Sequence, residues 1–381
     1  MSVIANIADL QERARRRLPK AVFDYVHGGS YDQLTLARNR ADLDALAIDQ
    51  RVMRDVSKVE TATTMIGDKA AIPLAVGPAG MAGLTWPNGE VETAKAAVAF
   101  GVPYCLSTFS INSIEDVAEA IRTPFWSQLY MMKVRSVNES LIRRAHEANC
   151  SALVMTLDVH VHSQRWADTR NGLTSPPKVT PANVVNMMLN APWALRMLAS
   201  KHHTFATMQA EVGARNVLEL AAWVNEQLDP SIDVGTIRWV RSLWDRKLIL
   251  KGILNVDDAK MAVDLGADAI IVSNHGGRQL DSAASTISVL PQIARAVGDR
   301  IEVLFDGGIR TGFDIVKAMG RGAHGCLSGR AWLYGLAADG GKGVTCALSL
   351  IAQELRDCMA LSGLTDLRDL PPGTIGPQPP L

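Results

Sequence analysis

His275 and Arg278 lie within residues 273–281 (SNHGGRQLD), directly after the apolar run 269–272 (AIIV). A short β-branched run is typical of a buried parallel strand, and the glycine pair permits a tight turn close to a ligand. Histidine exchanges protons near neutral pH, and arginine can hold a carboxylate through two hydrogen bonds. The segment predicts a base and an anion-binding group together, although a His-Gly-Gly sequence by itself also occurs in loops without catalytic function.

The elements that would position these groups repeat along the chain. From residue 72 onward, short apolar runs alternate with segments of helical periodicity. About eight such units, with no dinucleotide-binding glycine motif at the first, predict an α/β fold of the (β/α)₈ TIM-barrel type; a doubly wound open sheet is the alternative. The predicted strands are 72–76, 103–107, 125–130, 152–157, 248–251, 269–272, 302–305 and 325–328.

In a barrel, the carboxyl ends of all strands meet on one face, where catalytic residues are found. Polar residues and glycines stand at nearly every one of these positions, so the sequence predicts one polar site on that face. The residues are Pro78, Ala79, Gly80, Ser107, Gln128, Tyr130, Thr156, Asp158, Lys251, His275, Arg278, Asp306, Gly308, Arg310, Gly329 and Arg330.

The last two predicted strands are followed by residues 306–310 (DGGIR) and 328–330 (SGR). At these two places, barrels commonly bind a phosphate through backbone N–H groups and a helix N-terminus. Arg310 or Arg330 can add a charge-assisted hydrogen bond. Tight turns would explain the glycines but not the two arginines, so we predict a phosphate site.

Composition and charge restrict the class of protein. The chain has 381 residues, and its 39 Lys and Arg balance 39 Asp and Glu, so no overall field favours nucleic acid as a partner. The five cysteines are widely spaced without a CxxC pair, which predicts neither a disulfide framework nor a metal site. Residues 1–20 lack the apolar core of a signal peptide. We therefore expect a cytoplasmic protein.

We interpret residues 1–381 as one domain with two additions to the barrel. Residues 1–64 are polar and helical without a clear strand signal, and they predict an N-terminal helical cap. Residues 170–246 form an insertion after the fourth strand that is far longer than a usual βα loop. A long helix is expected at 344–361, and the proline-rich tail 371–381 is expected to be irregular.

The centre of the insertion, residues 183–203, combines many apolar residues with a basic edge. This composition suits a helix that lies on a membrane surface, and Pro192 and the polar residues argue against one that spans it. A lid over the active site or an oligomer contact would use the same residues. The sequence leaves these three interpretations open.

The motifs at 273–281, 128–130 (QLY), 251–252 (KG) and 306–310 resemble those of the FMN-dependent L-2-hydroxy acid oxidoreductases, and the resemblance extends roughly from Ala8 to Leu364. It implies a barrel that binds FMN and oxidises an L-2-hydroxy acid to the 2-oxo acid. The family's tetrameric habit implies a homotetramer.

Five residues carry the catalytic roles that the resemblance implies. His275 would take the substrate proton, and Asp158 would stabilise the imidazolium that forms, because a carboxylate raises the pKa of its partner. Tyr130 would contact the 2-hydroxyl. Lys251 would lie beside the flavin N1–C2=O edge, where a cation stabilises reduced flavin. Arg278, the fifth residue, would bind the substrate carboxylate.

The resemblance also implies two binding sets. The substrate carboxylate would be held by Arg278 and Arg165, with a hydrogen bond from Tyr25, and the full substrate set is Tyr25, Tyr130, Arg165, Arg278, Phe109 and His162. The FMN set is Pro78, Ala79, Gly80, Ser107, Gln128, Thr156, Lys251, Ser273, Asp306, Gly308, Arg310, Gly329 and Arg330.

Gly80 and Phe109 bear on the acceptor and the substrate. Oxidases of the family carry alanine at the position of Gly80, whereas its dehydrogenases carry glycine, so we expect a quinone or cytochrome acceptor and weak use of O₂. Phe109 implies limited room, which favours lactate over mandelate, while His162 is unusual there. Attachment to the inner face of the plasma membrane is compatible with a quinone or cytochrome acceptor. The alternatives are an O₂-using oxidase, a flavin-free lyase or isomerase acting on a phosphorylated substrate, and a non-catalytic binding protein.

Overall fold

The computed structural model describes residues 3–172, 186, 190–212, 219–220, 223, 226–368, 370–371 and 373–377. Within this part of the chain, eight parallel strands are hydrogen-bonded in the order β4-β11-β10-β9-β8-β7-β6-β5. A parallel bridge between Val76 and Tyr104 joins the two ends of this order and closes the ring. The strands are β4 (Leu74–Val76), β5 (Cys105–Leu106), β6 (Trp126–Leu129), β7 (Ala152–Thr156), β8 (Lys247–Ile253), β9 (Ala269–Val272), β10 (Glu302–Asp306) and β11 (Gly325–Ser328).

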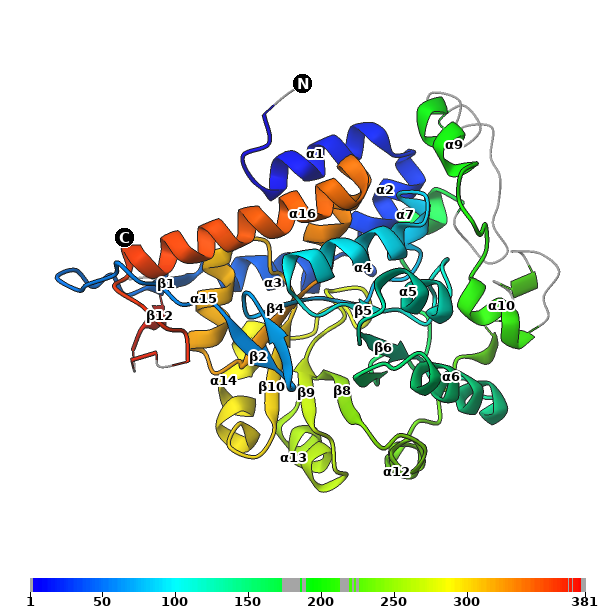
Figure 1. Cartoon of the computed structure of the whole chain (residues 1–381). Helices are drawn as coiled ribbons and strands as arrows, with labels where there is room; N and C mark the ends of the chain where they lie inside the picture. The colour runs from blue at the N-terminus through cyan, green and yellow to red at the C-terminus, as the bar shows by residue number, and fades with distance from the viewer. Residues whose placement is uncertain are drawn as a thin grey trace.

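The closed ring confirms the predicted TIM barrel and excludes the doubly wound open sheet, which would have two free edges. Helices surround the strands, as Figure 1 shows, and side-chain caps mark where several of them begin: Ser113, Asp233 and Thr311 each accept a hydrogen bond from a backbone N–H in the first turn. The helices are α4 (Gly89–Phe100), α5 (Ile114–Ile121), α6 (Arg135–Glu147), α12 (Val234–Leu243), α13 (Val256–Asp264), α14 (Thr286–Val297), α15 (Gly312–Gly320) and α16 (Arg330–Leu361).

Helix α16 differs from the expectation of a helix confined to residues 344–361. It begins at Arg330 and is interrupted at Asp339 and Gly340, which have non-helical backbone angles. Gly340 has a φ of +61°, and a Cβ there would lie 2.6 Å from the ring of Trp86. Only glycine meets both conditions easily. The break was missed because packing against Trp86, rather than the helical pattern, requires it.

The amino-terminal end of the barrel is plugged. The hairpin of β2 (Thr63–Met65) and β3 (Asp68–Ala70) lies there. The indole Nε1 of the fully buried Trp126 donates to Asp68 Oδ2 at 2.6 Å. Apolar side chains fill this end of the barrel, and the charge-assisted hydrogen bond to Asp68 closes it. The opposite, carboxyl face is therefore the one left for ligands.

The N-terminal segment packs against the barrel, with α1 (Ile7–Arg17) lying along α16 and α2 (Lys20–His27) beside it (Figure 1). It continues through α3 (Leu34–Asp44). Two expectations are wrong here: residues 46–48 form a strand, β1 (Leu46–Ile48), and part of the tail is regular, because β12 (Ile375–Pro377) pairs with β1 in antiparallel fashion. Three-residue strands between distant segments leave too little periodicity to detect.

Two short helices of the insertion, α9 (Ala191–Met197) and α10 (Ala206–Val212), lie on one side of the molecule (Figure 1). The helix α7 (Trp166–Arg170) comes just before the insertion, and α12 at its end lies beside the barrel. Most of the apolar segment expected between 183 and 190 lies outside the described residues. None of the helices described in this chain is long and apolar enough to cross a membrane.

Candidate active site at the carboxyl ends of the barrel strands

His275 occupies the turn directly after β9 and has a φ of +58°, a left-handed conformation that costs a non-glycine residue roughly 1–2 kcal/mol. Its backbone N–H donates to Ser273 Oγ at 3.1 Å. Its Nδ1 lies 3.0 Å from Asp158 Oδ1, and its Nε2 lies 3.3 Å from the hydroxyl of Tyr130. The contact of Nδ1 with Asp158 therefore fixes the ring, and Nε2 faces the space beside Tyr130.

The environment of His275 leaves its imidazole neutral. Burial lowers the pKa of His275, Asp158 raises it in part, and Lys251 and Arg278 lower it again, so the net shift is downward. For Asp158, burial raises the pKa, but His275 and Lys251 more than offset this, and the carboxyl pKa ends below its usual value. A neutral imidazole beside an ionised carboxylate is the arrangement of a general base.

Two guanidinium groups converge on Tyr25. The Cζ atoms of Arg278 and Arg165 lie 4.8 Å and 5.4 Å from the centre of its ring. Arg278 Nη1 donates to the carbonyl oxygens of Tyr25 and Gly28 at 2.6 and 3.0 Å. Arg165 Nε also pairs with the buried Asp168 at 2.6 Å. This buried ion pair holds the guanidinium of Arg165 next to Tyr25.

Aromatic side chains form the wall next to the base. Phe109 stacks on Tyr130 with ring centres 4.8 Å apart. The hydroxyl of Tyr25 donates weakly to the carbonyl of Gly80 at 3.4 Å. His162 lies on the segment after β7 and is exposed overall. Partial burial of its ring and the nearby charge of Arg165 lower the pKa of His162, and its contact with the substrate stays a prediction.

A buried ammonium lies on the barrel floor below the base. Lys251 Nζ donates to Ser273 Oγ at 2.9 Å and pairs with Asp306 Oδ2 at 3.1 Å. Burial lowers the pKa of Lys251, but Asp306 and Asp158 raise it more, so the group stays charged. The ammonium therefore provides a fixed positive charge for an electron-accepting ring.

On the other side of the floor, three polar side chains form a row. Ser107 Oγ donates to Gln128 Oε1 at 3.2 Å, and Gln128 Nε2 donates to Thr156 Oγ1 at 3.0 Å. All three are buried. Such a row offers several donors and acceptors to the polar edge of a heterocycle.

The ends of β10 and β11 have the features of a phosphate site. Ser328 Oγ is buried without a hydrogen-bond partner among the described residues. Gly329 precedes α16, and a Cβ built on it meets nothing within 4 Å. Arg310 Nη1 donates to the carbonyl of Ile309 at 2.8 Å, and its Cζ lies 5.8 Å from the centre of the Tyr334 ring. Open space at Gly329, an unpartnered hydroxyl, a helix N-terminus and a nearby guanidinium fit a bound phosphate.

Arg330 has a second task that the sequence did not reveal. Its guanidinium donates to four backbone carbonyls, those of Val26, His27, Gly28 and Gly276. Burial, together with the charges of Arg278 and Arg310, lowers the pKa of Arg330 to about 9. An anionic phosphate nearby would relieve this accumulation of positive charge.

Asn39 is a residue that sequence reasoning missed. Asn39 and Asn274 exchange two amide hydrogen bonds of 2.8 Å across 235 positions of sequence, and both side chains are buried. Gly277 N–H donates to Asn274 Oδ1 at 3.2 Å, so the pair holds the turn of His275 against α3. No local signal distinguishes Asn39 from other polar residues of its helix.

A hollow of about 440 Å³ lies away from these groups, between α6 and α12. It contains none of the predicted site residues, so we assign it no role in the chemistry. Its lining residues are Met131, Met132, Lys133, Arg135, Asn138, Asp229, Ser231, Asp233, Thr236 and Trp239. In the described residues, no cluster of three His, Cys, Asp or Glu could hold a metal ion.

A TIM barrel whose carboxyl face brings together an imidazole, two guanidiniums, a buried ammonium and groups that fit a phosphate suits a flavin-dependent oxidoreductase. The sequence pattern of FMN-dependent dehydrogenases matches residues 14–377. The chain belongs to the FMN-dependent dehydrogenase family. This confirms the expected FMN cofactor and the expected class, the FMN-dependent 2-hydroxy acid oxidoreductases.

Relatives and solved structures agree with this assignment. The L-lactate dehydrogenase of Caulobacter sp. (strain K31) is 44% identical over 367 residues, which cover 96% of both chains. The L-lactate dehydrogenase of Vibrio parahaemolyticus serotype O3:K6 (strain RIMD 2210633) is 41% identical over 370 residues, 97% of both. The structure of the monotopic membrane protein (S)-mandelate dehydrogenase matches with a TM-score of 0.95 and 34% identity, covering 99% of this chain and 100% of its own.

Proposed function

We propose that the enzyme oxidises an L-2-hydroxy acid with a small side chain, L-lactate first and mandelate-like acids second, and passes the electrons to a quinone or a cytochrome. One observation carries the proposal: His275 Nε2 lies 3.3 Å from Tyr130, and Phe109 stacks on the same ring at 4.8 Å. The base therefore stands beside a wall of two aromatic rings. The names of the relatives at 44% and 41% identity also support lactate.

In this proposal, each residue has a task that its contacts allow. Arg278 and Arg165 bind the substrate carboxylate, and Tyr25 donates a hydrogen bond to it. Neutral His275 accepts the substrate proton, and Asp158 stabilises the resulting imidazolium at 3.0 Å. FMN, when bound, would accept the two electrons, and the substrate's second proton would leave with them or be released to solvent.

The cofactor would be held by the remaining groups on the same face. Ser107, Gln128 and Thr156 would hydrogen-bond the flavin ring, and Lys251 would lie at its anionic edge. The backbone of Pro78, Ala79 and Gly80 and the side chain of Ser273 complete the ring site. Asp306, Gly308, Arg310, Gly329 and Arg330 would hold the ribityl phosphate end.

The direct test is anaerobic mixing of the purified yellow protein with a panel of L-2-hydroxy acids, followed at the flavin absorption band. We expect L-lactate to bleach the flavin faster than L-mandelate, and the D-acids to leave it oxidised. A flavin that L-mandelate bleaches faster than L-lactate would contradict the proposed order of substrates. A flavin that neither acid bleaches would contradict both proposed substrates.

The pH dependence of kcat/KM should report the base. Burial lowers the pKa of His275 below that of a free histidine, and proton abstraction needs the neutral ring. Activity should therefore be full at neutral pH and fall only in the acid range below the pKa of a free histidine. Because Asp158 raises this pKa, Asp158→Asn should move the acid limb to lower pH. It should also lower the plateau by about 10²-fold, since the imidazolium loses its counter-charge. A limb that moves to higher pH would contradict this role.

Gly80→Ala tests the choice of electron acceptor. A methyl group on Gly80 would lie 3.4 Å from Phe109 Cβ and 3.6 Å from the Tyr25 hydroxyl, so it fits without displacing backbone. We expect the rate with O₂ relative to a quinone analogue to rise by about tenfold, equivalent to about 1.4 kcal/mol. Gly376→Ala is the matched control, because a Cβ there meets nothing within 4 Å. An unchanged ratio in Gly80→Ala would count against this role and leave an O₂-using oxidase open.

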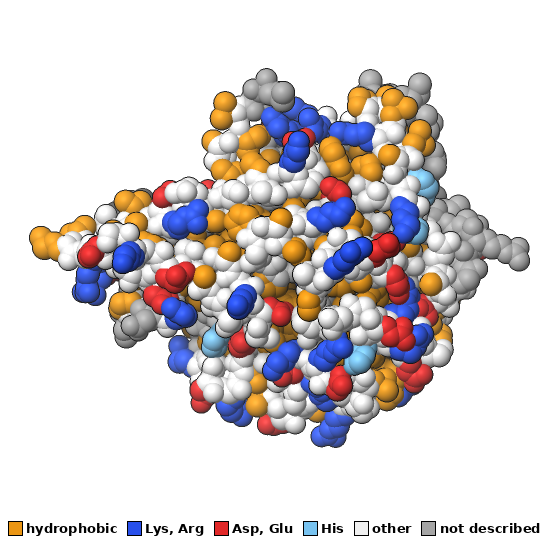
Figure 2. Space-filling model, in the orientation of Figure 1, with side chains coloured by type: hydrophobic (Ala, Val, Ile, Leu, Met, Phe, Trp, Pro, Cys, Tyr) orange, Lys and Arg blue, Asp and Glu red, His pale blue; other side chains and the backbone are white. Residues whose placement is uncertain are grey.

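We also propose that α9 attaches the enzyme to a membrane surface. Leu195 and Leu198 expose 68% and 75% of their side chains, and Figure 2 shows apolar and basic side chains together at this corner of the molecule. The double variant Leu195→Asp/Leu198→Asp should lose most sedimentation with anionic lipid vesicles while keeping turnover with a soluble dye. Leu361→Asp, at a 63% exposed position on α16, is the control. Equal vesicle binding by the wild type, the double variant and Leu361→Asp would refute this attachment.

We also propose a homotetramer, which light scattering of the purified protein would test.

A further inference from the structure

The return arm of the insertion, residues 199–212, reaches the aromatic wall of the active site. Its Phe205 packs on Phe109 with ring centres 6.2 Å apart and planes inclined by 56°. Phe109 in turn stacks on Tyr130 at 4.8 Å, and Tyr130 contacts His275. A continuous row of rings therefore connects the insertion to the base, and Phe205 is its outermost member.

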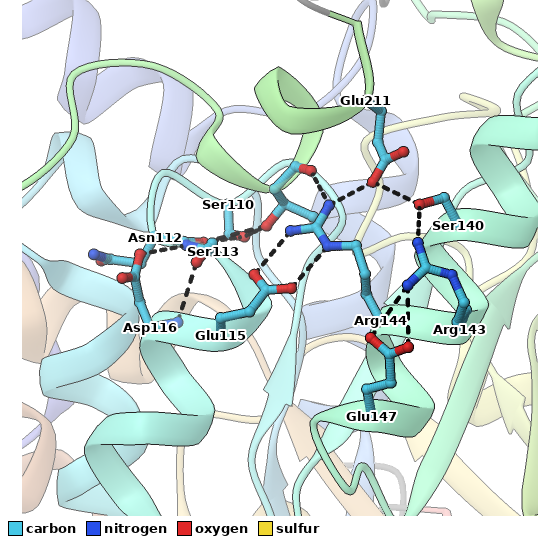
Figure 3. Close-up of polar contacts among 11 residues, drawn as sticks. Ser110, Asn112, Ser113, Glu115, Asp116, Ser140, Arg143, Arg144, Glu147 and Glu211 are labelled. Atoms are coloured by element: carbon cyan, nitrogen blue, oxygen red, sulfur yellow. Dashed lines mark hydrogen bonds and ion pairs between the residues drawn. The ribbon is translucent and has the colours of Figure 1, made fainter.

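A buried guanidinium holds this arm on the barrel. Arg144 of α6 is 9% exposed and donates through Nε and Nη2 to both carboxylate oxygens of Glu115 on α5, each at 2.8 Å. Its Nη1 donates to Glu211 Oε1 and to the carbonyl of Thr207, each at 2.7 Å. Figure 3 shows Arg144 between the carboxylates of Glu115 and Glu211. One side chain thus joins two barrel helices to α10 of the return arm.

The return arm is also bonded to the segment that carries Phe109. Ala206 N–H donates to the carbonyl of Ile111 at 3.3 Å. The hydroxyls of Ser110 and Thr207 lie 2.9 Å apart, and both are buried. Phe205 and Phe109 therefore belong to two chain segments that are fastened together within one or two residues of each ring.

The chain just before Phe205 in the sequence is anchored as well. His202 Nε2 lies 2.8 Å from Asp116 Oδ2, and Lys201 Nζ pairs with the other oxygen of the same carboxylate. Asp116 also caps α5 through the backbone N–H of Ser113. With anchors before and after it, Phe205 has little freedom to move away from Phe109.

We propose that Phe205 is a specificity-determining residue that braces Phe109 and so limits the room for the substrate side chain, and that Arg144 and Glu211 act as positioning residues for it. The inference rests on the proposed oxidation of L-2-hydroxy acids. It assigns the insertion a part in substrate selection that is independent of any membrane attachment. A braced wall disfavours a phenyl side chain relative to a methyl group, whereas a wall that can move outward accommodates it better.

The test compares kcat/KM for L-lactate and L-mandelate in the FMN-loaded enzyme. Phe205→Ala should shift the ratio toward L-mandelate by about tenfold or more, the effect expected for a change in the size of an apolar pocket. Phe205→Leu should shift it less. Thermal unfolding of each variant, monitored by flavin fluorescence, separates this effect from loss of the fold, because a purely structural role would lower both rates together.

Glu211→Ala and Glu115→Ala form a matched pair, because each removes one carboxylate from the same guanidinium. Only Glu211 lies on the return arm, so only Glu211→Ala should shift the ratio in the direction of Phe205→Ala. Wild-type turnover with an unchanged ratio in Phe205→Ala, or equal shifts in the two glutamate variants, would overturn the inference alone. Wild-type flavin that neither acid reduces would overturn the proposed function, and the inference with it.

Discussion

Replacing His275 by alanine is expected to leave a yellow, FMN-loaded protein whose reduction by L-lactate is slower by about 10⁴-fold, the upper range for loss of a general base. The side chain of His275 accepts the substrate proton in our proposal, and its Nδ1 contact with Asp158 at 3.0 Å holds it in position. The expected phosphate site after β10 and β11 does not involve this ring. The variant should therefore keep its FMN while losing its catalytic activity.

Stopped-flow measurement of flavin bleaching under anaerobic conditions gives the rate, and the absorption spectrum gives the FMN content. His146→Ala is the matched histidine control, since this side chain is exposed on α6, contacts Asp245 and should leave the rate nearly unchanged. Reduction of His275→Ala at the wild-type rate would remove His275 from the mechanism. Loss of FMN from this variant would show that the turn after β9 also supports the cofactor.

Arg278→Met should lower kcat/KM for L-lactate by about 10³-fold, mostly through KM, because breaking a buried charge pair costs about 2–5 kcal/mol. Arg278 donates to the carbonyls of Tyr25 and Gly28, and the ring of Tyr25 lies against its guanidinium at 4.8 Å. These contacts fix the orientation of the guanidinium before substrate binds. Methionine keeps roughly the volume of the side chain and removes both the charge and the paired N–H donors.

Steady-state kinetics with a soluble dye acceptor would measure this loss, and added guanidinium ions should restore part of the activity. Arg38→Met is a suitable control, because Arg38 is exposed and donates to the carbonyl of Ala283 rather than into the site. If Arg278→Met kept the wild-type KM for L-lactate, the carboxylate would have to bind elsewhere. Arg165 would then be the next candidate.

Much of the barrel could be predicted because its strands are buried on both faces. Such strands appear as short continuous apolar runs, as in Ala269–Val272 of β9 and residues 303–305 of β10. The segments between them have helical periodicity, as in Ile114–Ile121 of α5. By contrast, β1 and β12 were missed, because each is three residues long and finds its partner at the other end of the chain.

The chemistry of the site was equally visible, because it depends on residue types at strand ends. His275, Lys251 and Arg310 all follow or end apolar runs, and the structure brings the predicted base, ammonium and cation to one face. The supporting residues were not visible. Asn39 and Phe205 act through partners that are distant in sequence, and nothing in their own neighbourhoods marks them.

The sequence by itself determined the barrel, the family and the chemical groups available, since periodicity and motif spacing are local properties of the chain. Only the tertiary structure decided how these groups are held: the left-handed turn of His275, the four carbonyls around Arg330, and the clamp of Arg144 on the insertion. Those arrangements depend on hydrogen bonds and ring contacts between segments far apart in sequence, whose geometry exists only after the chain has folded.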